Sequence, residues 1–134
     1  MILLEEIKVK TPKREVLINI TSEINKIVKN ANIDEGVCRV FVPHTTAGVT
    51  INENADPAVM KDIISYLNKL IPQNAGFSHM EGNSDAHIKS SLTGSSLDVI
   101  IHQGKLVLGT WQGCYLAEFD GPRNRKIYVQ VQGE

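Results

Sequence analysis

The sequence has few of the features that mark secreted, membrane-spanning or nucleic-acid-binding proteins. It contains only two cysteines, and its net charge is −1, with both signs mixed along its 134 residues. Two cysteines without a CxxC pair or a Cys/His ligand spacing exclude a disulfide framework and a zinc-finger type of site. So small a net charge gives no general attraction to nucleic acid or to a membrane surface. We therefore expect neither partner.

Long apolar runs are also missing. No stretch approaches the ~20 apolar residues that a membrane-spanning helix needs. The N-terminal MILLEEIKVK places acidic residues directly after its short apolar start, which does not fit a signal peptide. We interpret Cys38 and Cys114, each in a strand-like run, as small core residues, with a catalytic Cys114 as the alternative. A cytoplasmic protein is expected.

The remaining composition, 42% hydrophobic and 22% charged, is that of an ordinary globular chain. Its length predicts a single domain over residues 1–134. Alternating apolar and charged residues predict strands at 3–9 and 16–20, joined as a hairpin. Further strands are predicted from apolar runs, with those after residue 96 forming a meander: 37–42, 49–51, 97–102, 106–109, 113–120 and 127–132.

Three helices are expected among these strands. Asp56 suits an N-cap and Pro57 a first helical position, so a long helix begins there and ends before Pro72. Shorter helices are predicted from about residue 21 to 30 and from Ser84 or Asp85 to Ser91. The sequence thus predicts the α+β class, with a mixed, mainly antiparallel β-sheet or sandwich, one long helix and two short ones.

Residues 77–92, FSHMEGNSDAHIKSSL, are too polar for a core element and are typical of a site loop. This stretch holds His79, His87 and two carboxylates. Together with His44, these side chains could bind a phosphate or a divalent metal, zinc through imidazole or magnesium through carboxylate. No HxxxH or HxH spacing puts two ligands on one element, so surface histidines without a function remain the alternative.

A phosphate could also bind at the start of the helix expected near Asp85, where Lys89, Ser90 and backbone N–H groups lie close by. A carboxylate at this cap would oppose an anion unless a cation intervenes. A second polar stretch, INENADP, is a candidate for substrate binding through Asn52 and Asn54. A turn followed by a helix cap is the simpler interpretation of its residues, Asp56 included.

Glu118 lies in GCYLAEF, where both faces of the strand are apolar. Carboxylates are rarely buried without a partner. Glu118 is therefore either a strand-end residue that reaches solvent, or a buried group directed at a site. The second case predicts a raised pKa or an ionic partner such as Arg39 or a lysine.

Trp111 and Gln112 are flanked by glycines, which indicates a bulge or a close backbone approach. We interpret the tryptophan as an interface residue rather than a core residue. The basic turn formed by residues 123–126 is expected to be solvated, with a phosphate contact as the alternative.

Three blocks of the sequence, HTTAGVTINENADP, EGNSDAHIKSSLTGSSL and GKLVLGTWQGCYLAEFDGPR, followed by VQVQGE, resemble the YjbQ-like family. This family is often named the secondary thiamine-phosphate synthase enzyme family. The resemblance covers nearly the whole chain. It implies an α+β fold, a homotrimer, and a metal ion or anion near the histidines that correspond to His44, His79 and His87. The family's carboxylate corresponds to Glu118. The acidic loop is shorter than in some members, which affects the position of His79.

The resemblance also implies a weak thiamine-phosphate synthase activity, which joins a pyrimidine diphosphate to a thiazole phosphate and releases pyrophosphate. We therefore expect a cytoplasmic, trimeric enzyme in which His44, His79 and His87 hold a divalent metal (zinc or magnesium) or a substrate phosphate. His44 and Glu118 are the expected catalytic residues. The alternatives are a metal-dependent hydrolase or phosphatase and a non-enzymatic trimeric module that binds a metal or a small molecule. The expected substrate-binding residues are Asn52, Asn54, Asp56, Lys89, Ser90, Trp111 and Gln112.

Overall fold

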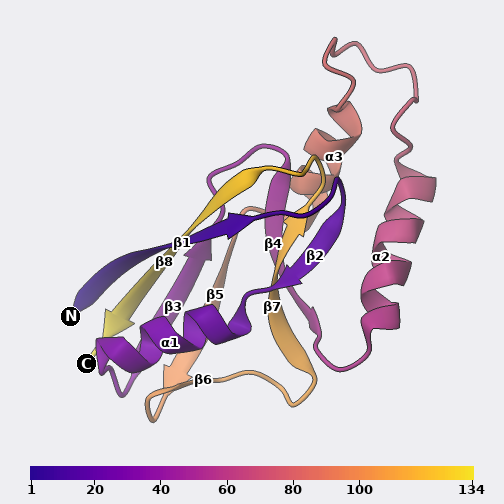
Figure 1. Ribbon diagram of the computed structural model, residues 1–134. Coiled ribbons are helices and arrows are strands. Elements are labelled where there is room, and N and C mark those ends of the chain that lie inside the picture. The colour runs from indigo at the N-terminus through magenta and orange to yellow at the C-terminus, as the bar shows by residue number, and fades with distance from the viewer.

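The computed structural model describes all residues, Met1–Glu134, and contains two antiparallel sheets and three helices (Figure 1). The helices are α1 (Thr21–Ala31), α2 (Pro57–Leu70) and α3 (Ser84–Thr93). The strands are β1 (Ile2–Lys10), β2 (Val16–Asn19), β3 (Gly36–Phe41), β4 (Ala47–Glu53), β5 (Ser96–His102), β6 (Lys105–Leu106), β7 (Gln112–Glu118) and β8 (Asn124–Gly133).

The strands form a five-stranded sheet in the order β1-β8-β3-β5-β6 and a three-stranded sheet in the order β2-β7-β4. This arrangement confirms the predicted α+β class with mainly antiparallel sheets. No helix has the length and apolar character that crossing a membrane requires.

Two predicted strand pairings are wrong. β2 does not form a hairpin with β1 but pairs with β7 in the other sheet. The late strands are not a meander, because β7 lies between β2 and β4, and β8 pairs with β1 and β3 in the larger sheet. Apolar alternation indicates which face of a strand is buried, but it does not identify the neighbouring strand.

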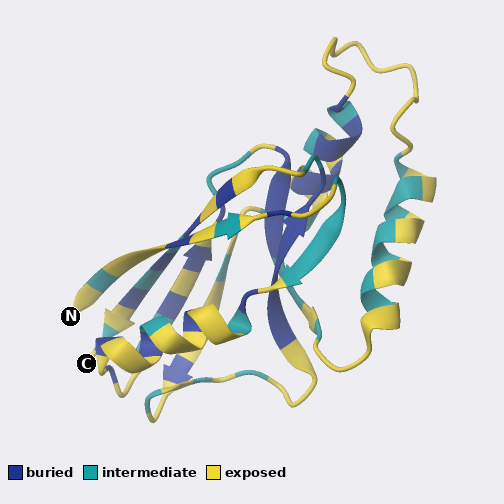
Figure 2. Ribbon diagram, in the orientation of Figure 1, coloured by how far each residue is buried: buried dark blue, intermediate teal, exposed yellow.

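The main core contains buried side chains from both sheets and from α1. Figure 2 shows buried positions along β3, β7 and β8 and at the start of β4. Cys38 and Cys114 are both fully buried there as free thiols, which confirms them as core residues. Burial raises the pKa of Cys114, and that of Cys38 to about 12. Since the thiolate is the nucleophilic form, this environment does not support a catalytic Cys114.

Helix α2 lies at the side of the molecule, and none of its residues is fully buried (Figure 2). Its start is as predicted: the Asp56 side chain accepts a hydrogen bond from the Ala58 N–H, and Pro57 is the first helical residue. The inner side of α2 contributes Ile64 and Leu67 to a small cluster around Phe119. The cap and the proline define this helix locally, although little of it is buried.

Helix α3 packs closely on β4. A Cβ atom on Gly48 would come within 2.5 Å of the Gly94 carbonyl oxygen, so only glycine allows this approach. The Val49 N–H donates to that oxygen, and Ser90 Oγ donates to the Ala47 carbonyl. The N-cap is Asn83 rather than the predicted Ser84 or Asp85. These contacts place α3 beside the connection between β3 and β4.

Candidate functional site

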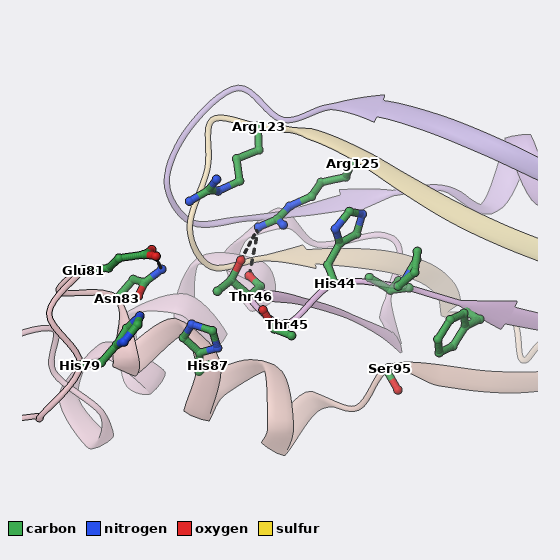
Figure 3. Close-up of a pocket in the computed structure, with 13 residues that line it drawn as sticks. His44, Thr45, Thr46, His79, Glu81, Asn83, His87, Ser95, Arg123 and Arg125 are labelled. Carbon is green, nitrogen blue, oxygen red and sulfur yellow. Dashed lines mark hydrogen bonds between the residues drawn. The ribbon is translucent and has the colours of Figure 1, made fainter.

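A pocket of about 650 Å³ lies between α3 with its preceding loop, the β3–β4 connection and the start of β8 (Figure 3). The three histidines that the sequence singled out all line this pocket. The histidines at positions 79 and 87 are on the side of α3, and two arginines are on the side of β8. The lining residues are Phe41, Val42, Pro43, His44, Thr45, Thr46, His79, Glu81, Asn83, His87, Ser95, Arg123 and Arg125.

The rings of His79 and His87 are neighbours, with centroids 5.5 Å apart and an interplanar angle of 89°. His79 is exposed, whereas His87 is half-buried at the start of α3. Nowhere in the chain do three His, Cys, Asp or Glu side chains come together closely enough to hold a metal ion. The residues as arranged therefore do not fit the expected three-histidine metal site within one chain.

His44 has a defined protonation state. The Lys126 backbone N–H donates to its Nε2 atom at 3.0 Å. A ring nitrogen that accepts a hydrogen bond carries no proton, so the neutral ring has its proton on Nδ1. Burial and the nearby positive charge of Arg125 lower the pKa of His44. His44 is therefore a neutral N–H donor whose Nε2 atom is not free to bind a metal.

We expect the His44 imidazole to become protonated only below the ordinary histidine pKa of about 6.5. Because its pKa in the folded state is lowered, its contribution to stability is present above that ordinary value and is lost as the pH falls through the folded-state pKa. Ring ¹⁵N chemical shifts recorded as a function of pH measure both the tautomer and the pKa. A proton on Nε2 at neutral pH, or a pKa above 6.5, would contradict this assignment.

Glu118 is fully buried on β7 and binds Arg125. Its carboxylate accepts hydrogen bonds from Arg125 Nε at 2.8 Å, Thr11 Oγ1 at 2.8 Å and the Asp120 N–H at 3.1 Å. Burial acts to raise the pKa of Glu118, but these hydrogen bonds outweigh it and lower the pKa. The predicted raised pKa is therefore wrong.

The other alternative, an ionic partner, is present, but the partner is Arg125 rather than Arg39 or a lysine. Arg39 is exposed on β3 and pairs with Asp98 on the neighbouring strand β5. Glu118 does not line the pocket. It acts on the pocket indirectly, because its ion pair holds the Arg125 side chain in place.

Both pocket arginines are held by their Nε and Nη2 atoms. Arg125 uses them for Glu118 and Thr46. Arg123 uses them for the carbonyl and carboxylate oxygens of Asp120. In each guanidinium group the Nη1 atom has no hydrogen-bond partner in the chain, and both side chains are directed toward the pocket (Figure 3). Two charged donors thus remain for an anion.

Asn83 presents an unpaired oxygen in the pocket wall. Its Nδ2 donates to the carboxylates of Glu81 at 3.2 Å and Asp120 at 2.8 Å, which fixes the orientation of the amide. The Oδ1 atom is buried and has no partner. A buried acceptor without a donor costs about 1–3 kcal/mol. Nothing in the sequence distinguishes Asn83 from its neighbours in the polar stretch.

Five predicted substrate-binding residues do not line this pocket: Asn52, Asn54, Asp56, Trp111 and Gln112. β4 begins at Ala47 near the pocket and carries the chain to Glu53, about 20 Å away at the usual rise per residue. At that distant end, Asn54 donates to the carbonyls of Thr110 and Gln112. The sequence places these residues near His44, but the extended strand separates them from it. Their role in substrate binding stays a prediction.

Lys89 is fully buried outside the pocket. Its Nζ atom donates to Asn68 at 2.6 Å, Asp85 at 2.8 Å and Glu15 at 3.2 Å, and Asp85 also binds Arg14. This buried charge cluster, defined by these residues, ties α3 to α2 and to the start of β2. Lys89 lines neither this pocket nor the smaller one described next, and its role in substrate binding stays a prediction.

Ser90 borders a second, smaller cavity of about 400 Å³ that adjoins the first. The two cavities share the residues at positions 44, 45, 87 and 95. The residues that line it are His44, Thr45, His87, Ser90, Ser91, Gly94 and Ser95.

Comparison with known proteins shows the family. The sequence matches the family described as UPF0047 protein YjbQ-like over residues 5–134. It is 56% identical to UPF0047 protein MJ1081 of Methanocaldococcus jannaschii, over 95% of this chain and 92% of that protein. It is 46% identical to UPF0047 protein YugU of Bacillus subtilis, over 98% of this chain and 100% of that protein.

Solved structures agree. A YjbQ-like protein of unknown function from Sulfolobus solfataricus P2 superimposes with a TM-score of 0.96 at 33% identity, covering 100% of this chain and 99% of its own. An uncharacterized conserved protein of the YjbQ/UPF0047 family from Clostridium acetobutylicum gives 0.94 at 52% identity, covering 96% and 99%. The resemblance of the sequence blocks is thereby confirmed: the chain belongs to the YjbQ-like UPF0047 family.

Proposed function

We propose that the protein is an enzyme that acts on a small phosphorylated substrate, whose phosphate binds in the larger pocket. The observation that carries this proposal is the pair of guanidinium groups, Arg123 and Arg125, each of which keeps its Nη1 donors unpaired at the pocket. A guanidinium N–H group binds phosphate oxygens through charge-assisted hydrogen bonds, which the two free Nη1 atoms can donate. Glu81 is the only carboxylate in the lining, so little negative charge opposes an anion there.

The histidines have different roles in this proposal. His79 and His87 lie across the pocket from the arginines, where they can transfer protons to and from a bound substrate (Figure 3). His44 supplies a neutral N–H group. Glu118 is a positioning residue that acts through Arg125.

The reaction we propose is the one that the family resemblance implies, a transferase reaction of the thiamine-phosphate synthase type. The pyrimidine carbon breaks its bond to the diphosphate oxygen and forms a bond to the thiazole nitrogen, and the diphosphate leaves with the bonding electrons. The main task is to stabilise the leaving diphosphate, for which two arginines are suited. A divalent metal would supply the same stabilisation. The chain assembles no three-ligand set for one, so no step here is assigned to a metal.

Hydrolysis of a phosphate ester is the second candidate. The neighbouring imidazoles of His79 and His87 are accessible from the pocket and could activate a water molecule beside a bound phosphate. An assay of the wild-type protein with the two thiamine precursors and, separately, with a panel of phosphate esters distinguishes the candidates. Release of pyrophosphate together with thiamine phosphate supports the synthase. Ester turnover without coupling supports the hydrolase, and phosphate binding without any turnover supports a binding module.

Arg123→Ala should weaken the binding of inorganic phosphate by about 10- to 100-fold, because a hydrogen bond to a charged group contributes ~1.5–3 kcal/mol. Isothermal titration calorimetry measures the dissociation constant. Arg39→Ala is the matched control, since Arg39 is also half-exposed and paired with an aspartate but lies outside the pocket. Equal affinity in the Arg123 variant and the wild type would remove the anion site.

We further propose that the chain forms a homotrimer, as the family resemblance implies. The support is its exposed apolar surface: Trp111 is 65% exposed, and Tyr66 and Leu70 on α2 are each 62% exposed. Light scattering should give three times the 14.8 kDa mass of one chain, and Trp111→Glu should lower it. A wild-type protein that stays monomeric would refute the trimer.

We propose the cytoplasm as its compartment, in keeping with two unpaired cysteines.

A further inference from the structure

We propose that the cleft between α2 and β2 binds a small carboxylate with an unbranched apolar chain, a ligand separate from the substrate of the larger pocket. Helix α2 lies beside β2 at the side of the molecule (Figure 1). A cavity of about 290 Å³ opens between them, close to the lower end of the ~300–1,000 Å³ that small-molecule sites occupy. The inference does not depend on the proposed function, because this cavity and the larger pocket share no residue.

The walls of this α2–β2 cleft are apolar. Met60 and Ile64 are one helical turn apart on α2, and Val16 and Leu17 line the opposite wall on β2. None of the four is fully buried, so the chain itself covers this apolar surface only in part. An apolar chain that enters the cleft removes the surface from water, which is favourable.

Two lysines give the cleft a positive charge. Lys13 and Lys61 are exposed in its lining, and neither ammonium group has an ion-pair partner in the chain. The one carboxylate in the lining, Glu15, already binds Arg14 at 3.0 Å and Lys89 at 3.2 Å. The unpaired charge in the cleft is therefore positive and attracts an anion.

The acidic residue of α2 does not offset these lysines. Asp62 lines a separate cavity on another side of the helix, together with Ile63 and Tyr66. Apolar walls beside unpaired ammonium groups complement a molecule with an apolar chain and one anionic end. A straight-chain carboxylate is the simplest molecule of this class.

Such a ligand holds α2 against the sheet. It contacts both walls only while α2 is docked on β2, so it binds the docked state and not a locally opened one. Asn68 of α2 and Glu15 of the cleft both accept hydrogen bonds from Lys89 on α3. Ligand binding therefore also stabilises the contacts of α3, the helix that carries His87.

Calorimetry at neutral pH with straight-chain carboxylates, from acetate to octanoate, tests the cleft. The affinity should rise about fourfold for each methylene group that enters the cleft, until the cleft is full. Octanol and octylammonium carry the same chain with a neutral or a positive end. Both should bind at least about threefold more weakly than octanoate, because they make no ion pair with the lysines.

Variants of α2 locate the ligand. Lys61→Glu should weaken octanoate binding by about 3- to 10-fold, since it replaces an exposed ion pair by a repulsion. Lys69→Glu, at an exposed lysine of α2 outside the cleft, is the control and should bind octanoate as the wild type does. Met60→Trp fills the cleft with a larger side chain and should abolish binding. If Met60→Trp does not fold, Lys61→Glu decides alone.

Hydrogen exchange gives a second measurement. At about ten times the dissociation constant of octanoate, the backbone amides of α2 should exchange about tenfold more slowly, the protection expected from a ligand that binds only the docked state. Acetate at the same concentration is the control and should give no protection.

Several results would overturn the inference. Equal affinity along the carboxylate series, or for octanoate and octanol, would exclude a cleft that recognises both the chain and the charge. Unchanged binding in Lys61→Glu or in folded Met60→Trp, or unchanged exchange of α2, would exclude this location. Loss of octanoate binding in Arg123→Ala would place the carboxylate in the larger pocket instead. None of these results measures phosphate binding, so the proposed function stands or fails separately.

Discussion

Glu118→Ala is expected to lower the free energy of unfolding by about 3–5 kcal/mol, the usual cost of removing one partner of a buried ion pair. The side chains of Arg125 and Glu118 are 4% and 0% exposed. Without the carboxylate, the guanidinium group would be left buried without a counter-charge. Thr11 Oγ1 and the Asp120 N–H would lose their acceptor as well.

Urea denaturation of the variant and the wild type measures this change. Glu5→Ala, at an exposed glutamate on β1, is the control and should change the stability by less than about 0.5 kcal/mol. Glu118→Gln keeps the shape but not the charge, so its loss should be smaller, and its phosphate affinity should fall because Arg125 is oriented less strictly. A loss below 1 kcal/mol in Glu118→Ala would show that this pair contributes little.

The same ion pair predicts a direction for the pH dependence of stability. The pKa of Glu118 is lowered in the folded state, so its stabilising contribution is fully present above the pKa of the unfolded chain. It is lost as the pH falls through the folded-state pKa, below the ordinary value of about 4.3. In Glu118→Gln this part of the acid sensitivity should be absent.

Asp85→Ala should have the second large effect, again about 3–5 kcal/mol of unfolding free energy. Asp85 and Lys89 are both completely buried and pair at 2.8 Å. Burial acts to raise the pKa of Asp85, but hydrogen bonds from Arg14 and Lys89 outweigh it and lower the pKa. Without Asp85, the buried Lys89 ammonium keeps only Asn68 and Glu15 as partners.

The control for Asp85 is Asp98→Ala, which breaks the exposed pair with Arg39 and should cost only about 0.2–1 kcal/mol. A double variant, Asp85→Leu with Lys89→Met, replaces the buried charges by apolar side chains of similar size. It should be more stable than Asp85→Ala alone, because no uncompensated charge is left behind. If the two variants unfold at the same urea concentration, the loss in Asp85→Ala comes from packing and not from charge.

Local signals explain the parts of the fold that the sequence predicted correctly. The start of α2 depends on Asp56 and Pro57 alone, and its end lies next to Pro72, so neighbouring residues define it. The placement of β2 depends on β7, about a hundred residues away along the chain, and no pattern within residues 16–19 identifies that partner. The hairpin prediction failed for this reason.

The candidate site was predicted in part. The polar stretch and the family resemblance singled out His44, His79 and His87, and the structure places all three in the lining of one pocket. Arg125 was interpreted as part of a solvated turn, although a signal existed: it shares the buried face of β8 with Ile127, Val129 and Val131. A charged residue at an inward position of an alternating strand indicates that it has a buried partner of opposite charge. Glu118, a carboxylate in an apolar strand, was the candidate for that partner.

Helix α2 has a consequence for dynamics. Because none of its residues is fully buried, it can detach in a local opening event without exposing the main core, and its backbone amides should exchange with solvent sooner than those of β3 or β7. Such an opening breaks the hydrogen bond between Asn68 and Lys89. Helix α3, which carries His87, then loses one of its contacts with the rest of the fold. A subunit packed on α2 would suppress this fluctuation, so assembly would stiffen the pocket at a distance.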